Sequence, residues 1–402
     1  MSEILHPAVT RPVRRSGLYE ALLRRVLSGL RYGHFTCVTP QGQLYEARGP
    51  LPGPQARLVL QDWQILRALL LEGDTGLATA YIAGGWSTPD LTALIESCAL
   101  NFNQAADSAL SVPLRALQRL RHKARANNRT GAKRNIMAHY DLGNDFFASW
   151  LDESMLYSSA LYEGAAQTLE AAQAAKLALI ADWLDTPTGG SVLEIGCGWG
   201  ALARHLGCGG AQVTGVTISP AQLAYAQEVI RKAELTSNVS LALRDYRDET
   251  GHYDRIVSVE MIEAVGEAYW PDYFRTLRAR LKPGGRAVLQ IITIAAERFA
   301  AYRRGADFIQ SHVFPGGMLL TKAGVAAQAE AAGLRPGRVR HFGASYARTL
   351  ADWRTRFHAA WPQLEQQGFD TRFRRLWDYY LCYCEAGFIT GSVDVGLYEL
   401  RG

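Results

Sequence analysis

The sequence predicts an α/β fold, in which a larger domain built on a mostly parallel sheet follows a small α+β domain. Its 402 residues exceed one average domain, so we expect two. After about residue 190, apolar runs typical of buried strands alternate with helical patterns, which indicates βαβ units. One of these strands ends in a glycine-rich turn. The composition, 48% hydrophobic and 20% charged, excludes a disordered chain.

The first domain shows short, mixed patterns. Residues 35–47 predict a hairpin around a turn at 40–43. A helix-like stretch covers 56–71, and another helix is expected to begin at Ser87 or Thr88. Residues 18–30 have one apolar face and several arginines. Such a basic amphipathic helix can lie on a membrane, but it packs on its own domain more often.

Basic residues concentrate in one connector, residues 114–134. It contains eight Lys or Arg and no acid, which leaves a net −3 for the rest of the chain from the total of +5. A local basic strip on a near-neutral body indicates a docking surface, although a solvated linker helix explains the charges equally well. We therefore divide the chain into residues 1–113, the connector 114–134 and residues 135–402.

The larger domain carries five apolar runs with strand character. These expected strands are residues 191–196, 211–218, 239–246, 254–261 and 285–294. From about residue 340 the chain is rich in Trp, Tyr and Phe at helical spacings, which predicts a helical region with a packed aromatic core.

The glycine-rich turn is the strongest local signal of a ligand site. Gly196, Gly198 and Gly200 follow a strand that contains Glu194 and precede a helix. Glycines there allow a tight turn and a close approach by a ligand. The spacing differs from that of dinucleotide folds, and the segment from Gly215 to Gln222 has no acid for a ribose. The pattern therefore favours a cofactor with a cationic amino-acid end, such as S-adenosylmethionine, over NAD.

Other common signals are missing from the sequence. No apolar run reaches the ~18 residues of a membrane-spanning helix, and the first residues do not read as a secretory signal. The six cysteines have neither disulfide nor zinc spacing. We expect a cytoplasmic protein that binds no metal and no nucleic acid.

Several long motifs occur in one order along the larger domain. They are HYDLGNDFFASWLDESMLYSS (139–159), VLEIGCGWG (192–200), VTGVTISPAQLAYAQ (213–227), DYRD (245–248), FPGG (314–317) and HFGASYARTL (341–350). This set resembles the cyclopropane-fatty-acyl-phospholipid synthase family and the related mycolic-acid-modifying methyltransferases, from about residue 135 to the end. The resemblance implies a class I S-adenosylmethionine-dependent methyltransferase fold and methyl transfer to an alkene carbon of a lipid chain. It also implies a homodimer.

The resemblance assigns cofactor contacts to residues that match the family's motifs. These are Tyr157, Ser158, Gly196, Gly198, Thr217, Ile218, Gln222, Asp245, Tyr246 and Arg247. In this assignment Thr217, Ile218 and Gln222 surround the ribose. The ring of Tyr246 would stack on the adenine, a contact that suits an aromatic side chain.

The resemblance also implies a base site, where the family holds bicarbonate with a Cys, a Glu, a His, an Ile backbone and a Tyr. Glu263, Ile292 and Tyr346 match, whereas Ser159 stands at the cysteine position and Gln290 at the histidine position. Serine and glutamine can still donate hydrogen bonds to an anion. They lack the charge of a protonated histidine, so bicarbonate binding stays open. Glu263 is expected to pair with the anion or with Tyr346.

The expected function is transfer of a methyl(ene) group to the double bond of an unsaturated fatty acyl chain in phospholipid, giving a cyclopropane fatty acid. The protein would work at the inner face of the membrane, with the connector 114–134 against an anionic surface. One alternative is a methyl-branched or methylated-diene product without ring closure. Further alternatives are a small-molecule methyltransferase and an inactive lipid-binding protein.

Overall fold

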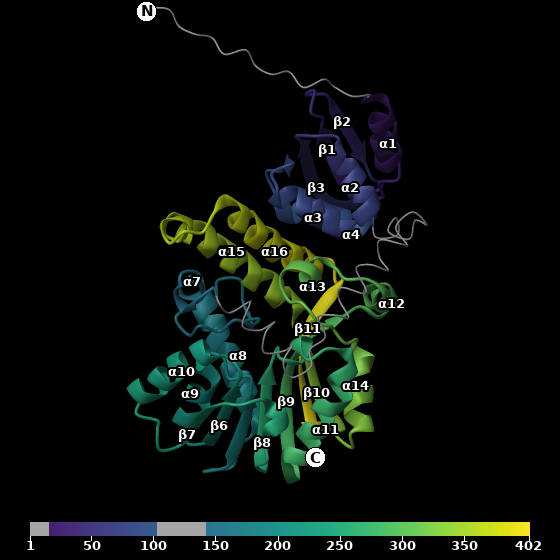
Figure 1. The fold of residues 1–402 in the computed structure, drawn as a ribbon. Coiled ribbons are helices and arrows are strands. Elements are labelled where there is room, and N and C mark those ends of the chain that lie inside the picture. Colours follow the sequence, from purple (N-terminus) through teal and green to yellow (C-terminus); the bar gives the residue numbers. More distant parts are fainter. Residues whose placement is uncertain (1–15, 103–141) are drawn as a thin grey trace, which may run out of the picture. The chain divides into compact units, whose positions relative to one another are not determined.

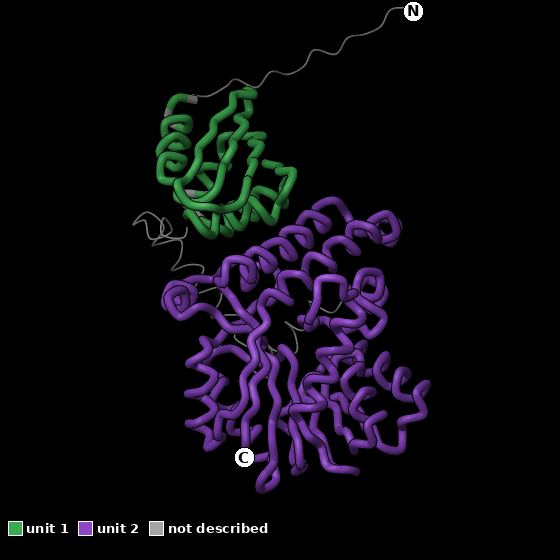
Figure 2. The backbone as a smooth tube through the Cα atoms, turned by 180° about the vertical axis from the view of Figure 1, so that it is seen from behind, with its two compact units in different colours: residues 1–107 green, residues 108–402 purple. Residues whose placement is uncertain are grey.

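The structure, a computed structural model of the chain, describes residues 16–102 and 142–402. The chain forms two units, residues 1–107 and 108–402, which Figure 2 shows in different colours. The expected boundaries at residues 113 and 134, and the connector between them, lie outside the described residues.

The first unit is built on a four-stranded sheet with the order β2-β1-β3-β4. Its elements are α1 (Ser16–Ser28), β1 (Tyr32–Val38), β2 (Leu44–Arg48), β3 (Leu51–Leu60), α2 (Gln64–Glu72), α3 (Asp74–Ile82), β4 (Trp86–Ser87) and α4 (Leu91–Asn101). The predicted hairpin is confirmed, because β1 and β2 pair antiparallel from Val38 and Leu44 onward. Helix α1 buries Leu23 and Leu27 and contacts β2 of its own unit, which is the packing that the sequence favoured over a membrane-surface role.

Two predictions in this unit are wrong. The first five residues of the helix-like stretch 56–71 belong to β3, which pairs parallel to β1, whereas residues 64–71 lie in α2. Ala56, Leu58 and Leu60 are buried at every second position, and that is the period of a strand. Helix α4 begins after Asp90, whose side chain accepts the amide of Ala93 at 3.0 Å as an N-cap. The predicted start at Ser87 is too early because Ser87 belongs to β4.

The second unit contains a seven-stranded sheet with the order β10-β11-β9-β8-β5-β6-β7. Its strands are β5 (Ser191–Ile195), β6 (Gln212–Thr217), β7 (Val239–Leu243), β8 (Tyr253–Val259), β9 (Leu281–Ile294), β10 (Arg335–His341) and β11 (Val393–Arg401). The five predicted strands are confirmed, and they run parallel. Strands β10 and β11 were not predicted. Strand β11, near the end of the chain, pairs antiparallel with both β9 and β10.

Helices pack against this sheet and across one end of it (Figure 1). They are α7 (Asn144–Ala148), α8 (Leu169–Leu184), α9 (Ala201–Cys208), α10 (Pro220–Lys232), α11 (Trp270–Arg280), α12 (Ala296–Arg304), α13 (Phe308–His312), α14 (Lys322–Ala331), α15 (Gly343–Gln366) and α16 (Thr371–Ile389), with short 3-10 turns η3 (Tyr246–Asp248), η4 (Ile262–Ala264) and η5 (Glu267–Tyr269). Helices α8, α9 and α10 contact one another and the sheet, and α11 contacts α14 and the sheet.

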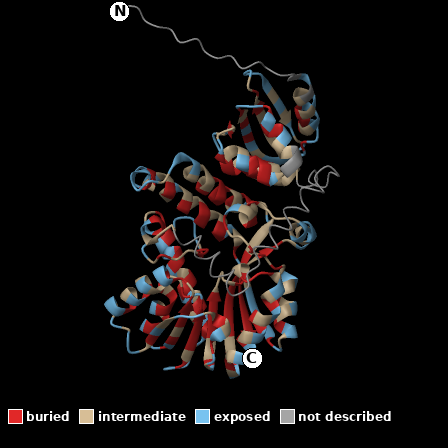
Figure 3. Ribbon diagram, in the orientation of Figure 1, coloured by how far each residue is buried: buried red, intermediate tan, exposed pale blue. Residues whose placement is uncertain are grey.

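Helices α15 and α16 lie at the carboxyl end of the parallel strands, since Val393, just after α16, pairs with Ile294 at the end of β9 (Figure 1). The strands are mostly buried (Figure 3). The predicted aromatic core is confirmed: the ring of Phe146 in α7 contacts Phe357 of α15 and Trp377 of α16.

No helix within residues 16–102 or 142–402 is long and apolar enough to cross a membrane. Over the same residues, no group of three or more His, Cys, Asp or Glu side chains is placed to hold a metal ion.

Candidate active site

The turn between β5 and α9 is formed by three glycines with positive φ. Gly196, Gly198 and Gly200 have φ angles of 83°, 51° and 88°, a region that residues with a side chain rarely adopt. The amide of Gly196 donates to the carbonyl of Val216 in β6 at 2.9 Å. A side chain at Gly198 would meet nothing within 4 Å, so the backbone here is open to a ligand.

Glu194 lies in β5 just before this turn, and its carboxyl is buried. The backbone of Ala203 in α9 donates to it, and burial raises its pKa to about 8. Its Oε2 has no hydrogen-bond partner among the described residues. A buried oxygen of this kind needs a donor. The cationic amino group of S-adenosylmethionine is such a donor, so the turn fits the predicted cofactor.

The residues expected around the ribose lie at the end of β6. The hydroxyl of Thr217 donates to Oε1 of Gln222 at 3.0 Å and accepts the amide of Ser219. Thr217 and Gln222 are buried, and Ile218 between them is half-buried. The structure brings the three together; their contact with a ribose stays a prediction.

Within the DYRD segment, Arg247 and Asp245 form an ion pair. Arg247 donates from Nε and Nη2 to the two carboxylate oxygens of Asp245 at 2.8 and 2.5 Å. The ring of Tyr246 is buried edge-on to Tyr273, with centroids 5.5 Å apart, and its hydroxyl has no partner in the described part of the chain. The stacking of Tyr246 on adenine remains a prediction.

Residues 156–158 are held in place by helix α8. Lys176 donates from Nζ to the hydroxyl of Ser158 at 2.7 Å, and Gln173 donates to the carbonyls of Leu156 and Ser158. Tyr157 shares a 2.8 Å hydroxyl–hydroxyl hydrogen bond with Tyr380 of α16. Lys176 is only 2% exposed, and burial lowers its pKa to about 8.

Three of the predicted base-site residues meet at the carboxylate of Glu260, which directly follows β8. Its Oε1 accepts the amide of Ser159 at 2.9 Å and the side-chain amide of Gln290 at 2.7 Å. Its Oε2 accepts the hydroxyl of Tyr346 at 2.7 Å. Donors from a loop, a strand and a helix thus converge on one carboxylate.

Glu263, the predicted acid of this site, has a different partner. The backbone amide of Ile292, which was expected to contact the anion, donates to its Oε1 at 2.6 Å. The expected contact with Tyr346 is wrong, because Tyr346 is bonded to Glu260. Burial and the neighbouring Glu260 raise the pKa of Glu263 to about 8, and its Oε2 has no partner within the described ranges.

The glycine turn and the two glutamates are neighbours. Strands β5 and β8 pair in parallel, with Ile195 opposite Ser258. Met261 stands between the two glutamates in sequence, and its Cγ would lie 3.1 Å from a Cβ at Gly196. The cofactor turn and the carboxyl groups therefore share the carboxyl end of the sheet, where open α/β sheets bind ligands.

Sequence reasoning missed Glu260, Lys176 and Gln173. Glu260 had a usable signal, because it is a carboxylate at the end of a predicted central strand, three residues before Glu263. Lys176 and Gln173 had none, since a polar residue on a helix is normally exposed.

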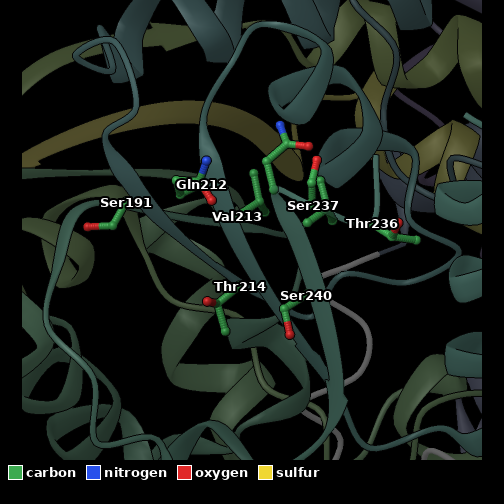
Figure 4. A pocket seen from close by; sticks show the side chains of 9 residues that line it. Ser191, Gln212, Val213, Thr214, Thr236, Ser237 and Ser240 are labelled. Atoms are coloured by element: carbon green, nitrogen blue, oxygen red, sulfur yellow. The ribbon is translucent and has the colours of Figure 1, made fainter. Parts of the chain in front are cut away.

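A shallow depression of about 180 Å³ lies elsewhere on this unit (Figure 4). Ser191, Gln212 and Val239, the first residues of β5, β6 and β7, help to line it. It is therefore at the amino end of these strands, opposite the site, and we assign it no role.

We expect Gly198→Ala to weaken binding of S-adenosylmethionine about tenfold or more, because a methyl group would occupy the open side of the turn. The positive φ should cost about 1–2 kcal/mol of stability. Gly200→Ala is the matched control: it has the same backbone penalty, but its Cβ would press on Ala226 at 3.0 Å, so it should lose more stability. Calorimetric titration and thermal denaturation measure the two effects. Unchanged binding by Gly198→Ala would place the cofactor elsewhere.

Comparison with known proteins identifies the family. Residues 127–397 match the model of the mycolic acid cyclopropane synthetase family. The tuberculostearic acid methyltransferase UfaA1 of Mycobacterium tuberculosis is 38% identical over 82% of this chain and 79% of its own. The cyclopropane-fatty-acyl-phospholipid synthase of Escherichia coli is 35% identical over 82% of this chain and 83% of its own.

Solved structures of cyclopropane synthases have a similar fold. The cyclopropane synthase MmaA2 from Mycobacterium tuberculosis superposes with a TM-score of 0.63 at 29% identity, covering 67% of this chain and 98% of that one. The mycolic acid cyclopropane synthase CmaA1, in complex with SAH and CTAB, gives 0.60 at 28% identity over the same shares. The chain therefore belongs to the mycolic acid cyclopropane synthetase family and has the fold of class I S-adenosylmethionine-dependent methyltransferases.

Proposed function

We propose that this protein transfers a methyl group from S-adenosylmethionine to the double bond of an unsaturated fatty acyl chain and closes a cyclopropane ring. One observation carries the proposal: the glycine turn and two half-buried glutamates adjoin each other at the carboxyl end of the sheet. The reaction needs both a bound methyl donor and a base, because methyl transfer must be followed by removal of a proton.

S-adenosylmethionine supplies an electrophilic methyl group. The π electrons of the alkene form a bond to the methyl carbon as its bond to sulfur breaks, which leaves positive charge on the other alkene carbon. A carboxylate then removes a proton from the new methyl group, and the electrons of that C–H bond close the ring. S-adenosylhomocysteine and one proton are released.

Aromatic side chains pack against one another beside Glu260, and one of them, Tyr346, donates to its carboxylate. The ring of Tyr346 stacks on Phe388 at 4.4 Å and meets Trp353 at 6.1 Å, and Trp353 meets Tyr157 at 5.3 Å. An alkene is a poor nucleophile, so a dry, close-fitting site favours its attack. Aromatic faces also stabilise positive charge, which the substrate carries after transfer.

A second candidate is methylation without ring closure. It is favoured by Ser159 and Gln290, the two departures from the family's base site, and by a 38% identical relative named as a methyltransferase. Removing the proton from a neighbouring chain carbon would leave a methyl-branched alkene.

The substrate would be an acyl chain esterified in phospholipid, reached from the inner face of the membrane. The basic connector 114–134, outside the described residues, would contact the anionic lipid headgroups. The proposal includes a homodimer, as the sequence resemblance implies.

The test uses the full chain, phospholipid vesicles with monounsaturated chains, and S-adenosylmethionine with a fully deuterated methyl group. Mass spectrometry of the released fatty acids reads the product. Ring closure predicts a gain of one carbon with two deuterons retained and no double bond. A methyl-branched alkene would keep three deuterons and its unsaturation. No labelled fatty acid in any vesicle would reject the proposal and leave a small-molecule substrate or an inactive lipid-binding protein.

A further inference from the structure

Glu260 has an unusual backbone conformation at the centre of the site. Its φ is 49°, in the left-handed region that a residue with a side chain adopts at a cost of about 1–2 kcal/mol. Its amide donates to the carbonyl of Gln290 at 2.8 Å, which holds this conformation against β9. A strained non-glycine residue that directly follows a central strand indicates a functional constraint on its side chain.

The carboxylate of Glu260 has a complete set of donors. The amide of Ser159 and the side-chain amide of Gln290 donate to one oxygen, and the hydroxyl of Tyr346 donates to the other. These donors come from segments that are far apart in the sequence, and the fold brings them together around one carboxylate. Because all three are engaged by Glu260, they are not available to a separate anion.

The surrounding charges favour a single negative charge here. Burial raises the pKa of Glu260, and the nearby cation of Lys176 on α8 opposes this rise. Burial and the negative charge of Glu260 raise the pKa of Glu263 in η4 to about 8, so Glu263 is the carboxyl of the two that stays protonated at neutral pH. Asp152 interacts with Lys176, Tyr380 and Cys384 interact with Glu260, and Tyr273, Tyr302 and Tyr398 interact with Glu263. A second anion beside Glu260 would meet like-charge repulsion.

We propose that the side-chain carboxylate of Glu260 is the proton acceptor of the reaction, built into the chain, so that turnover needs no exogenous bicarbonate. This deepens the proposed function and rests on it. The carboxylate takes the proton from the methylated substrate as the C–H electrons form the new carbon–carbon bond. The neutral carboxyl then loses that proton to solvent, which restores the ionised site.

The test compares the wild type with Glu260→Gly and Glu260→Gln in buffer freed of carbon dioxide. Glycine suits the positive φ and removes the carboxylate, which opens a space of its size. Glutamine keeps the shape and cannot accept the proton. We expect both variants to lose about 100-fold or more in turnover. Bicarbonate or formate should restore part of the turnover of Glu260→Gly only, and wild-type turnover should not respond to either. Binding of S-adenosylmethionine, unchanged in all three, shows that the fold is intact.

A second measurement needs no lipid substrate and so separates this proposal from the proposed function. Titration of ¹³C-labelled bicarbonate, followed by NMR line broadening, should show binding to Glu260→Gly and none to the wild type. Equal binding to both proteins would overturn the proposal, as would bicarbonate-dependent turnover of the wild type or full turnover by Glu260→Gln. Wild-type inactivity on every acyl chain, with the expected bicarbonate result, would instead reject the lipid substrate alone.

Discussion

Replacing Glu263 by Gln should remove part of a fall in stability that the wild type shows as the pH rises from about 5 to about 8. The pKa of Glu263 is raised from 4.5 to about 8, chiefly by burial. Between these two values the folded protein holds a proton that the unfolded chain has lost. Stability is therefore complete below the unfolded pKa and is lost as the pH rises through the folded one. The difference between wild type and variant should reach a few kcal/mol.

Denaturant titrations of both proteins at several pH values between 5 and 8.5 measure this effect. His205 and His341 have lowered pKa values and raise stability with pH, whereas Glu194, whose pKa burial raises to about 8, lowers it. These three groups act in both proteins alike. Subtracting the two curves cancels their contribution. Curves that stay parallel over the whole range would mean that Glu263 is ionised in the folded state at neutral pH.

Trp353→Ala should destabilise the second unit by about 3–5 kcal/mol, the usual cost of removing a large buried aromatic side chain. Trp353 is fully buried, and its ring contacts Trp150 at 5.7 Å, Tyr157 at 5.3 Å and Tyr346 at 6.1 Å. The cavity would also release Tyr346 from its position beside Glu260, so turnover should fall with stability.

Chemical denaturation gives the stability change, and Trp353→Phe is the matched control. The indole nitrogen of Trp353 has no partner among the described residues, so phenylalanine forfeits no hydrogen bond and leaves a smaller cavity. We expect it to cost less than half as much as alanine. A loss under about 1 kcal/mol for Trp353→Ala would show that α15 and the loop at Tyr157 do not depend on this contact.

The parallel strands of the second unit were predictable because their signal is local. Each is a short apolar run, as in residues 191–196, and such a run predicts a strand without information from elsewhere, even at β7, where only Val239 is buried. Strands β10 and β11 escaped prediction for the opposite reason. The burial pattern of β10 is almost wholly exposed, and β11 follows a long helical region, so neither carries the signal of a buried run bounded by turns.

The sequence predicted many of the residues that form the site, but not all of the contacts between them. The structure brings Thr217 to Gln222 and Ile292 to Glu263, while the roles of these residues in binding stay predictions. Tyr346, one of the two partners expected for Glu263, bonds Glu260 instead. Both glutamates lie in one short segment, and sequence spacing does not say which of them a distant hydroxyl reaches.

By itself the sequence determined the fold class, the family and the cofactor turn, because contiguous motifs and periodic patterns carry that information. Only the tertiary structure decided which carboxylate occupies the centre. The donors of Glu260 stand 101, 30 and 86 positions away, at Ser159, Gln290 and Tyr346. Lys176 likewise belongs to the site because the fold buries it against Ser158, and no local pattern predicts this contact. Hydrogen bonds between segments so far apart form only when the sheet and helix α15 are assembled, and no local pattern encodes them.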